Sequence, residues 1–260
     1  MNVLELRTEL SKCKTEKQSL LNDTYMWVKA AREAIINLNE DKIVFEVPGT
    51  NGRPRKVKRE KPEILKNRIV NKDIYNSAYV MMISLVEDYF NKIMKLLLFY
   101  DNNRIKCTIS NASMQTSIDI VDFIDNSKEE MISQIIYNRI DRIFYATPQV
   151  QLDYMDKALG INIKKDEWYK WIEYKARRDV IIHNNCIVNE VYSNKVNGYG
   201  RYKIGDTINF SESEFAIILT DFKSLIGQID HIIRQKYHIP TVKEAADFIS
   251  KKDMEILENL

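Results

Sequence analysis

Apolar residues recur at steps of three and four over most of the chain, which is the spacing typical of amphipathic helices. The strongest case is residues 75–100, where the repeated apolar positions are Tyr79, Met82, Ile83, Val86, Phe90, Ile93, Leu97 and Tyr100. Residues 128–147 are expected to bury Ile132, Ile136, Ile140 and Phe144. A weaker pattern over residues 3–39 predicts one long helix or a helical pair, with apolar residues at Leu4, Leu10, Leu20, Trp27, Ala30, Ala34 and Ile35. These patterns predict a mainly α fold.

Two shorter segments carry helix boundary signals. Thr147 stands before Pro148, and Gly160 follows the apolar positions after them. A capping residue, a proline in the first turn and a glycine past the end are the usual marks of a helix. Residues 164–185 predict another helix, with Asp166 as its N-cap and two asparagines at its end. Both segments extend the predicted helical bundle.

Two segments break the helical pattern. Residues 42–62 contain the strand-like "IVFEV" followed by proline and glycine, which predicts a hairpin or an exposed loop. Residues 187–210 place β-branched and aromatic residues on both sides of Asn197 and Gly198, a dipeptide typical of hairpin turns. A helical pattern resumes over residues 212–237. The expected fold is therefore a helical bundle with one or two small β-hairpin insertions.

Length and composition fit a globular protein. The chain has 260 residues, of which 45% are hydrophobic and 29% are charged. This length allows one large domain or two small ones. We divide it into an N-terminal segment (1–65), a main helical domain (66–240) and a C-terminal tail (241–260), or treat it as a single domain. The formal net charge is +2, so the overall charge does not indicate a nucleic-acid partner.

Cysteine usage and hydropathy bear on the compartment. The three cysteines, Cys13, Cys107 and Cys186, are widely spaced and form no CxxC pair, so we expect no disulfide framework in a reducing compartment. The N-terminus lacks the continuous apolar run of a secretory signal. The most apolar run is too short for a membrane span and contains Lys95. We therefore expect a cytoplasmic protein with no membrane partner.

Motifs for common cofactors and metals do not occur. The sequence has no Walker-type GK[ST], no HExxH and no GxSxG, and its three histidines are scattered. Without clustered carboxylates or histidines, a metal site built by the protein is not expected. We therefore predict neither a metal ion nor a cofactor.

A basic run at residues 53–61 could contact nucleic-acid phosphates. The competing interpretation is a solvated loop with no binding role, because charge runs usually face water. The candidate RNA-binding residues are Arg53, Arg55, Lys56, Lys58 and Arg59.

An acidic residue, Glu87, interrupts the apolar pattern of the helix at 75–100. It lies four residues after Ile83 and three before Phe90, hence on or beside the buried stripe. A buried carboxylate needs a partner, because burial of an unpaired charge is costly. At the edge of the stripe it would simply reach water.

The stretch "KARRDVIIHNN", residues 175–185, combines arginine, aspartate and histidine near a helix end. Asp179 and His183 are four residues apart and share a helix face, so the carboxylate can orient the ring. Arg178 lies five residues before His183 and Arg177 lies six before it. RNA cleavage by the 2′-hydroxyl needs a group that moves protons and a cation that stabilises the phosphorane. Imidazole and guanidinium are suited to these roles. The same letters also fit an ordinary helix end with surface charges.

The spacing Arg178-Asp179-x-x-x-His183-Asn184 resembles the Rx4–6H motif of the HEPN superfamily, whose members are small helical bundles. The wider stretch "RRDVIIHNNCIVNEVY" is similar to a HEPN subgroup in which "RRxxxxHNxGIVN" is followed by tyrosine. Cys186 stands where that pattern often has glycine. The helix at 75–100, with its internal acidic residue, is similar to the long early helix of the family. The resemblance covers about residues 70 to 237.

The resemblance implies a ribonuclease that needs no metal ion. Carried over by position, Arg178 would stabilise the phosphate and His183 would move the proton. Asp179 would orient or tune these two groups, and Asn184 would offer an amide contact. Arg177 is the alternative to Arg178 as the catalytic arginine, and Glu87 is a weaker supporting candidate. The products would be a 2′,3′-cyclic phosphate or 3′-phosphate and a 5′-hydroxyl.

The resemblance also implies partners. Catalytic HEPN proteins usually act as homodimers, with the two Arg/His motifs facing each other across a cleft, and the expected interface includes the helix at 168–185. Such proteins often serve as toxins or phage-defence effectors, which implies an antitoxin or a defence complex as a further partner. Two alternatives stay open at this point. One is a non-catalytic HEPN module that dimerises or binds RNA or nucleotides, and the other is a plain helical adaptor.

Overall fold

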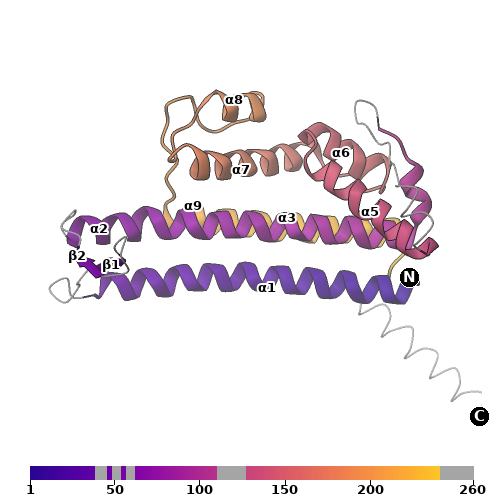
Figure 1. Cartoon of the computed structure of the whole chain (residues 1–260), viewed down its shortest axis with the longest axis horizontal. Coiled ribbons are helices and arrows are strands. Elements are labelled where there is room, and N and C mark those ends of the chain that lie inside the picture. Colours follow the sequence, from indigo (N-terminus) through magenta and orange to yellow (C-terminus); the bar gives the residue numbers. More distant parts are fainter. Residues whose placement is uncertain (39–45, 49–53, 57–61, 110–126, 241–260) are drawn as a thin grey trace, which may run out of the picture. The chain divides into compact units, whose positions relative to one another are not determined.

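The computed structural model describes residues 1–38, 46–48, 54–56, 62–109 and 127–240. Helices dominate these residues (Figure 1), so the prediction of a mainly α fold is confirmed. The helical elements are α1 (Val3–Ile36), α2 (Pro62–Arg68), η2 (Ile69–Asp73, a π-helical turn), α3 (Ile74–Tyr100), η3 (Asn102–Lys106, a 3₁₀ turn), α5 (Lys128–Phe144), α6 (Pro148–Lys157), α7 (Lys165–His183), α8 (Glu190–Val196) and α9 (Glu212–Lys236).

The chain divides into two compact units. Unit 1 comprises Met1–Gln18, Val86–Ile172 and Lys223–Leu260, and unit 2 comprises Ser19–Leu85 and Glu173–Phe222. The four long helices α1, α3, α7 and α9 each contribute residues to both units. The units therefore interleave along the chain instead of following one another. The boundaries predicted at residues 65 and 240 stay predictions.

The helix predicted at 75–100 is confirmed as α3. All its expected apolar positions are buried except Tyr100, which is partly exposed. In unit 1, the ring of Phe90 contacts those of Trp168 and Trp171, whose centroids are 5.8 Å and 5.5 Å away. Edge-to-face and tilted aromatic contacts of this kind add stability beyond their buried area. Phe90 and the two tryptophans therefore join α3 to the first half of α7 within unit 1.

In unit 2, Tyr79 joins α3 to the second half of α7. The Tyr79 hydroxyl donates a hydrogen bond of 2.8 Å to the backbone carbonyl of Tyr174. Its ring contacts those of Phe210 and Phe222. Since Tyr79 is fully buried, its hydroxyl needs this acceptor, and the bond sets the position of α7 on α3.

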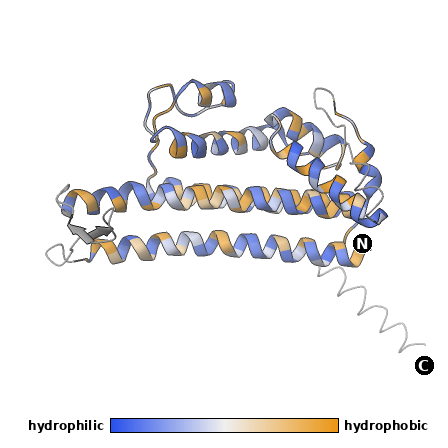
Figure 2. Cartoon of the chain, viewed as in Figure 1, coloured by the Kyte–Doolittle hydropathy of each residue, from blue (hydrophilic) through white to orange (hydrophobic). Residues whose placement is uncertain are grey.

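The apolar pattern predicted for residues 3–39 selects the wrong helix face. Of its positions only Leu10 is buried, while Leu4 and Trp27 have 62% and 49% of their surface exposed. The buried face of α1 consists of Leu6, Leu10, Cys13, Lys17, Leu21, Thr24 and Val28. These positions repeat at steps of three and four. Because two of them, Lys17 and Thr24, are polar, a search for apolar residues alone does not identify this face. Figure 2 shows hydrophilic and hydrophobic residues interleaved along this helix.

The buried lysine of this face is paired. The Lys17 ammonium lies 2.6 Å from the Asp88 carboxylate and 3.1 Å from that of Glu16, all within unit 1. Burial raises the pKa of Asp88, but the hydrogen bonds and charges of Lys17 and Lys92 together outweigh burial and hold that pKa below its usual value. The pair allows Lys17 to take an otherwise apolar position.

The hairpin predicted around Asn197 and Gly198 is wrong, because residues 190–196 form helix α8. The Asn189 side chain caps this helix by accepting a hydrogen bond of 3.1 Å from the Tyr192 backbone N–H. Asn197 then ends it in the left-handed conformation, with φ of 43°, and Gly198 follows with φ of 85°. A left-handed Asn-Gly pair serves a helix C-terminus as well as a hairpin turn, so the dipeptide alone does not separate the two.

Strand structure is limited to short pieces among the described residues. Strands β1 (Glu46–Pro48) and β2 (Pro54–Lys56) pair antiparallel, with Val47 opposite Arg55. A single bridge joins Ile187 to Thr207.

The burial of the cysteines predicts their reactivity. Burial raises the pKa of the Cys13 thiol to about 11, and Cys186 is also buried, whereas Cys107 is partly exposed. The thiolate is the reactive form, so we expect iodoacetamide at pH 8 to alkylate Cys107 first. Cys13 and Cys186 should react only after unfolding, as followed by peptide mass spectrometry. Labelling of native Cys13 as fast as Cys107 would contradict this burial.

Candidate functional site: the α7–α8 pocket

The C-terminal half of α7 presents one face to a pocket in unit 2. Ala176, Asp179, Val180 and His183 follow one another at steps of three, one and three, which places them on the same side of the helix. The pocket has a volume of about 270 Å³ and is lined by Ala176, Asp179, Val180, His183, Asn189, Val191, Tyr192 and Lys195. Asp179 and His183 therefore line one pocket, and the His183 side chain is exposed to solvent.

Asp179 lies between two cations. One of its oxygens, Oδ1, accepts a hydrogen bond of 3.0 Å from Arg178 Nη1, and the other, Oδ2, accepts one of 2.7 Å from Lys195 Nζ. The Asp179 and Arg178 side chains are 29% and 25% exposed, and Lys195 is 45% exposed. Arg178 does not itself line the pocket, but it is joined to it through the carboxylate of Asp179. The cluster thus holds two cations and one carboxylate beside an exposed imidazole.

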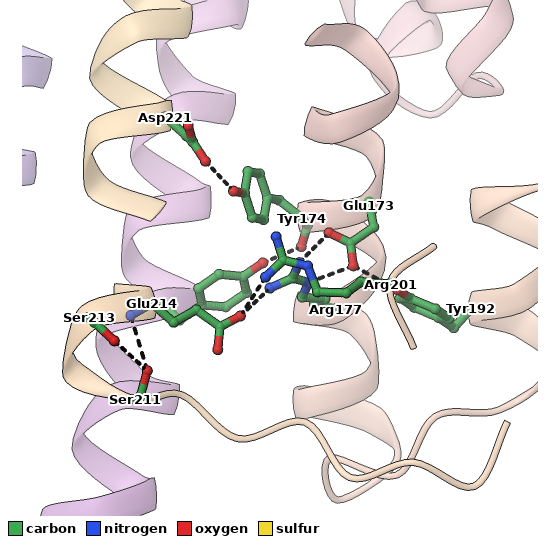
Figure 3. A network of polar contacts seen from close by, with 10 residues as sticks. Glu173, Tyr174, Arg177, Tyr192, Arg201, Ser211, Ser213, Glu214 and Asp221 are labelled. Carbon is green, nitrogen blue, oxygen red and sulfur yellow. Dashed lines mark hydrogen bonds and ion pairs between the residues drawn. The ribbon is translucent and has the colours of Figure 1, made fainter. Parts of the chain in front are cut away.

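The neighbouring arginine, Arg177, belongs to a buried network instead (Figure 3). Its Nε and Nη2 donate to the two oxygens of Glu173, each over 2.6 Å, and its Nη1 donates to Glu214 over 3.1 Å. The guanidinium also lies 5.0 Å and 5.1 Å from the ring centroids of Tyr174 and Tyr202. Its side chain is only 1% exposed, so Arg177 is not accessible to a phosphate in solution.

The same network holds α8 against α7. The Tyr192 hydroxyl donates a hydrogen bond of 2.7 Å to Glu173 Oε1, which also receives Arg177. Burial, and then the Glu173 carboxylate, raise the pKa of Tyr192 above its usual value, so the phenol stays protonated and remains a donor. Tyr174 donates in turn to Asp221 on α9 (Figure 3). The position of the pocket wall therefore depends on Glu173.

The turn after His183 contains two residues in the left-handed conformation. Asn185 has φ of 49° and Cys186 has φ of 67°, and the Cys186 N–H donates to the Val180 carbonyl over 3.2 Å. This bond spans six residues and closes the turn after the helix, whose left-handed positions are ones that glycine adopts without strain. The Asn184 amide donates to the Ile187 carbonyl, so it braces the turn. Cys186 thus takes up a conformation that glycine favours.

Among the other predicted residues, Glu87 does not line this pocket, and the basic residues of 53–61 are described only in part. Glu87 is partly exposed at the edge of the α3 stripe and belongs to unit 1. Arg53, Lys58 and Arg59 lie outside the described residues. Of Arg55 and Lys56, the structure describes only the backbone, which forms part of β2.

Sequence reasoning missed the α8 side of the pocket, namely Asn189, Val191, Tyr192 and Lys195. The signal was present, since Asn189 is a favoured N-cap residue and Tyr192 and Lys195 are three apart, as on one helix face. The hairpin interpretation of Asn197-Gly198 concealed it. Glu173 was missed because its role depends on the buried position of Arg177.

The described ranges contain no group of three or more histidine, cysteine, aspartate or glutamate side chains that could hold a metal ion. Among these residues, no helix combines the length and apolar character needed to cross a bilayer. Comparison with known proteins adds no relative: no family model, no curated protein and no solved structure matches the chain.

Proposed function

We propose that the protein is a HEPN-type ribonuclease that cleaves RNA without a metal ion. The observation that carries this proposal is the exposed imidazole of His183, which shares a pocket with Asp179 while Arg178 is ion-paired to the same carboxylate. The imidazole and the carboxylate thereby line a pocket open to a substrate, and the guanidinium is joined to that pocket through the carboxylate. These are the groups that the chemistry of RNA cleavage requires.

In the proposed reaction, the RNA 2′-oxygen attacks the adjacent phosphorus and the bond from phosphorus to the 5′-oxygen breaks. His183 takes the proton from the 2′-hydroxyl or supplies the proton to the leaving 5′-oxygen. Arg178 stabilises the charge that builds up on the phosphorane, and Asp179 holds Arg178 in place. The products are a 2′,3′-cyclic phosphate and a 5′-hydroxyl.

The proposal includes a homodimer formed through residues 168–185. The reaction needs both a base and an acid, and two copies of the motif facing each other would supply two imidazoles. A cytoplasmic enzyme of this kind would act as a toxin or phage-defence effector, restrained by an antitoxin or a defence complex. The alternative is a HEPN module that binds RNA without cleaving it.

The test is incubation of the purified protein with a fluorescent single-stranded RNA in EDTA. We expect cleavage into products with 2′,3′-cyclic phosphate and 5′-hydroxyl ends. Enzymes that label or ligate a free 3′-hydroxyl or a 5′-phosphate should not act on these ends. A His183→Gln preparation purified in the same way controls for contaminating ribonuclease. Binding of the RNA without cleavage would favour the binding module, and cleavage that requires magnesium would overturn the mechanism.

A further inference from the structure

The α7–α8 pocket has more binding groups than the Arg/His motif explains. Its α8 side adds the ammonium of Lys195 and an apolar side chain, Val191. We propose that the pocket binds one unpaired nucleotide of the RNA, with Lys195 holding the phosphate and the apolar wall contacting the base. This inference rests on the proposed function, because it names how that site recognises its substrate.

The net charge around Lys195 favours the binding of an anion. An ammonium group has three N–H donors, and Lys195 uses one of them on Asp179 at 2.7 Å. Asp179 is also neutralised by Arg178 at 3.0 Å, so the three ion-paired groups sum to one positive charge. A phosphate entering the pocket therefore meets a net cation with unused donors. The exposed His183 lines the same pocket from its α7 side.

The remaining wall suits a base. Val191, with 57% of its area exposed, supplies apolar surface, and the buried side chains of Ala176 and Val180 form the apolar packing beneath the pocket. A pocket of about 270 Å³ is close to the lower end of small-molecule pockets, roughly 300 Å³. It is thus sized for one nucleotide, and an unpaired base offers its faces to such a wall, whereas a paired base does not.

The pocket is also held in shape before a ligand arrives. Tyr192 is hydrogen-bonded to Glu173 over 2.7 Å, and Lys195 is ion-paired to Asp179 over the same distance. Both contacts tie α8 to α7. A preformed pocket loses less conformational freedom on binding, which favours affinity for a small ligand.

The probe is adenosine 3′-monophosphate, which has no phosphodiester bond to cleave. It is titrated into the wild-type protein by isothermal titration calorimetry. Lys195→Met is expected to weaken binding about tenfold or more, since a hydrogen bond to a charged group is lost. Lys195→Arg keeps the positive charge and should retain most of the affinity for the nucleotide. Its difference from Lys195→Met would show that the charge of this side chain contributes to binding. Lys203→Met, an exposed lysine of the same unit, is the matched control and should bind as wild type does.

The base contact is tested by Val191→Asp, which places a carboxylate in the pocket and should abolish binding. Ile204→Asp is its control, because Ile204 is similarly exposed, at 59%, and does not line the pocket. Adenosine and inorganic phosphate, titrated separately, should each bind more weakly than the nucleotide. Equal affinity of the Lys195→Met and Lys203→Met variants, or phosphate binding as tightly as the nucleotide, would overturn the inference.

These measurements separate the inference from the proposed function. Nucleotide binding through Lys195 in a protein that does not cleave RNA would support the pocket and overturn the ribonuclease. RNA cleavage by a protein whose nucleotide affinity is unchanged in Lys195→Met would support the ribonuclease and overturn the pocket.

Discussion

Replacing Glu173 with alanine is expected to lower the free energy of unfolding by about 3–5 kcal/mol, the usual cost of breaking a buried ion pair. The substitution leaves the Arg177 guanidinium, 1% exposed, with the ion pair to Glu214 and the two tyrosine rings but without its closest carboxylate. It also removes the acceptor of the Tyr192 hydroxyl. Because the destabilised groups join α7, α8 and α9, the loss should affect the pocket as well as the global stability.

Urea unfolding followed by circular dichroism and tryptophan fluorescence measures this effect. Glu33→Ala, an exposed glutamate inside α1, is the control and should change stability by no more than about 0.5 kcal/mol. Adding Arg177→Met to Glu173→Ala should recover part of the loss, since no buried charge is then left without its partner. Glu214 keeps Arg201 as a partner at 3.0 Å in the double variant. Equal stability of Glu173→Ala and Glu33→Ala would show that the network does not stabilise the fold.

Replacing His183 with glutamine is expected to lower the rate of RNA cleavage by about 10²–10⁴, the usual contribution of a general acid or base. Stability should be unchanged, because the side chain is exposed and is not part of the buried network. The measurement is the initial rate of cleavage of one labelled RNA in EDTA. His231→Gln removes another exposed histidine, located in unit 1, and should cleave at the wild-type rate.

The same assay distinguishes the two arginines. Arg178→Ala should lower cleavage by about 10²–10³, as expected when one stabiliser of the transition-state charge is removed, and should leave the protein folded. Arg177→Ala should instead lower the urea midpoint of unfolding, because it leaves the buried Glu173 carboxylate without its ion-pair partner. A folded Arg178→Ala variant with full activity would exclude Arg178 from the mechanism.

Much of the site could be predicted from local spacing. Asp179 and His183 are four residues apart, and any helix through them places both on one face, as the pocket lining shows. The choice between Arg177 and Arg178 could not be predicted in this way. Adjacent residues on a helix point about 100° apart, and the positions of the neighbouring Glu173 and Glu214 decide which arginine is buried.

The sequence by itself determined the long helices, because their repeat is set within each segment, and the shared face of Asp179 and His183. It did not determine α8 or the buried face of α1. Only the tertiary structure decided that Lys17 is buried, since its partner Asp88 is distant in sequence. It also decided that Lys195 pairs with Asp179, although the two residues are 16 positions apart in the sequence. The physical reason is the same in both cases: a charge takes its place in a fold according to the partner that packs against it, and no local pattern records that partner.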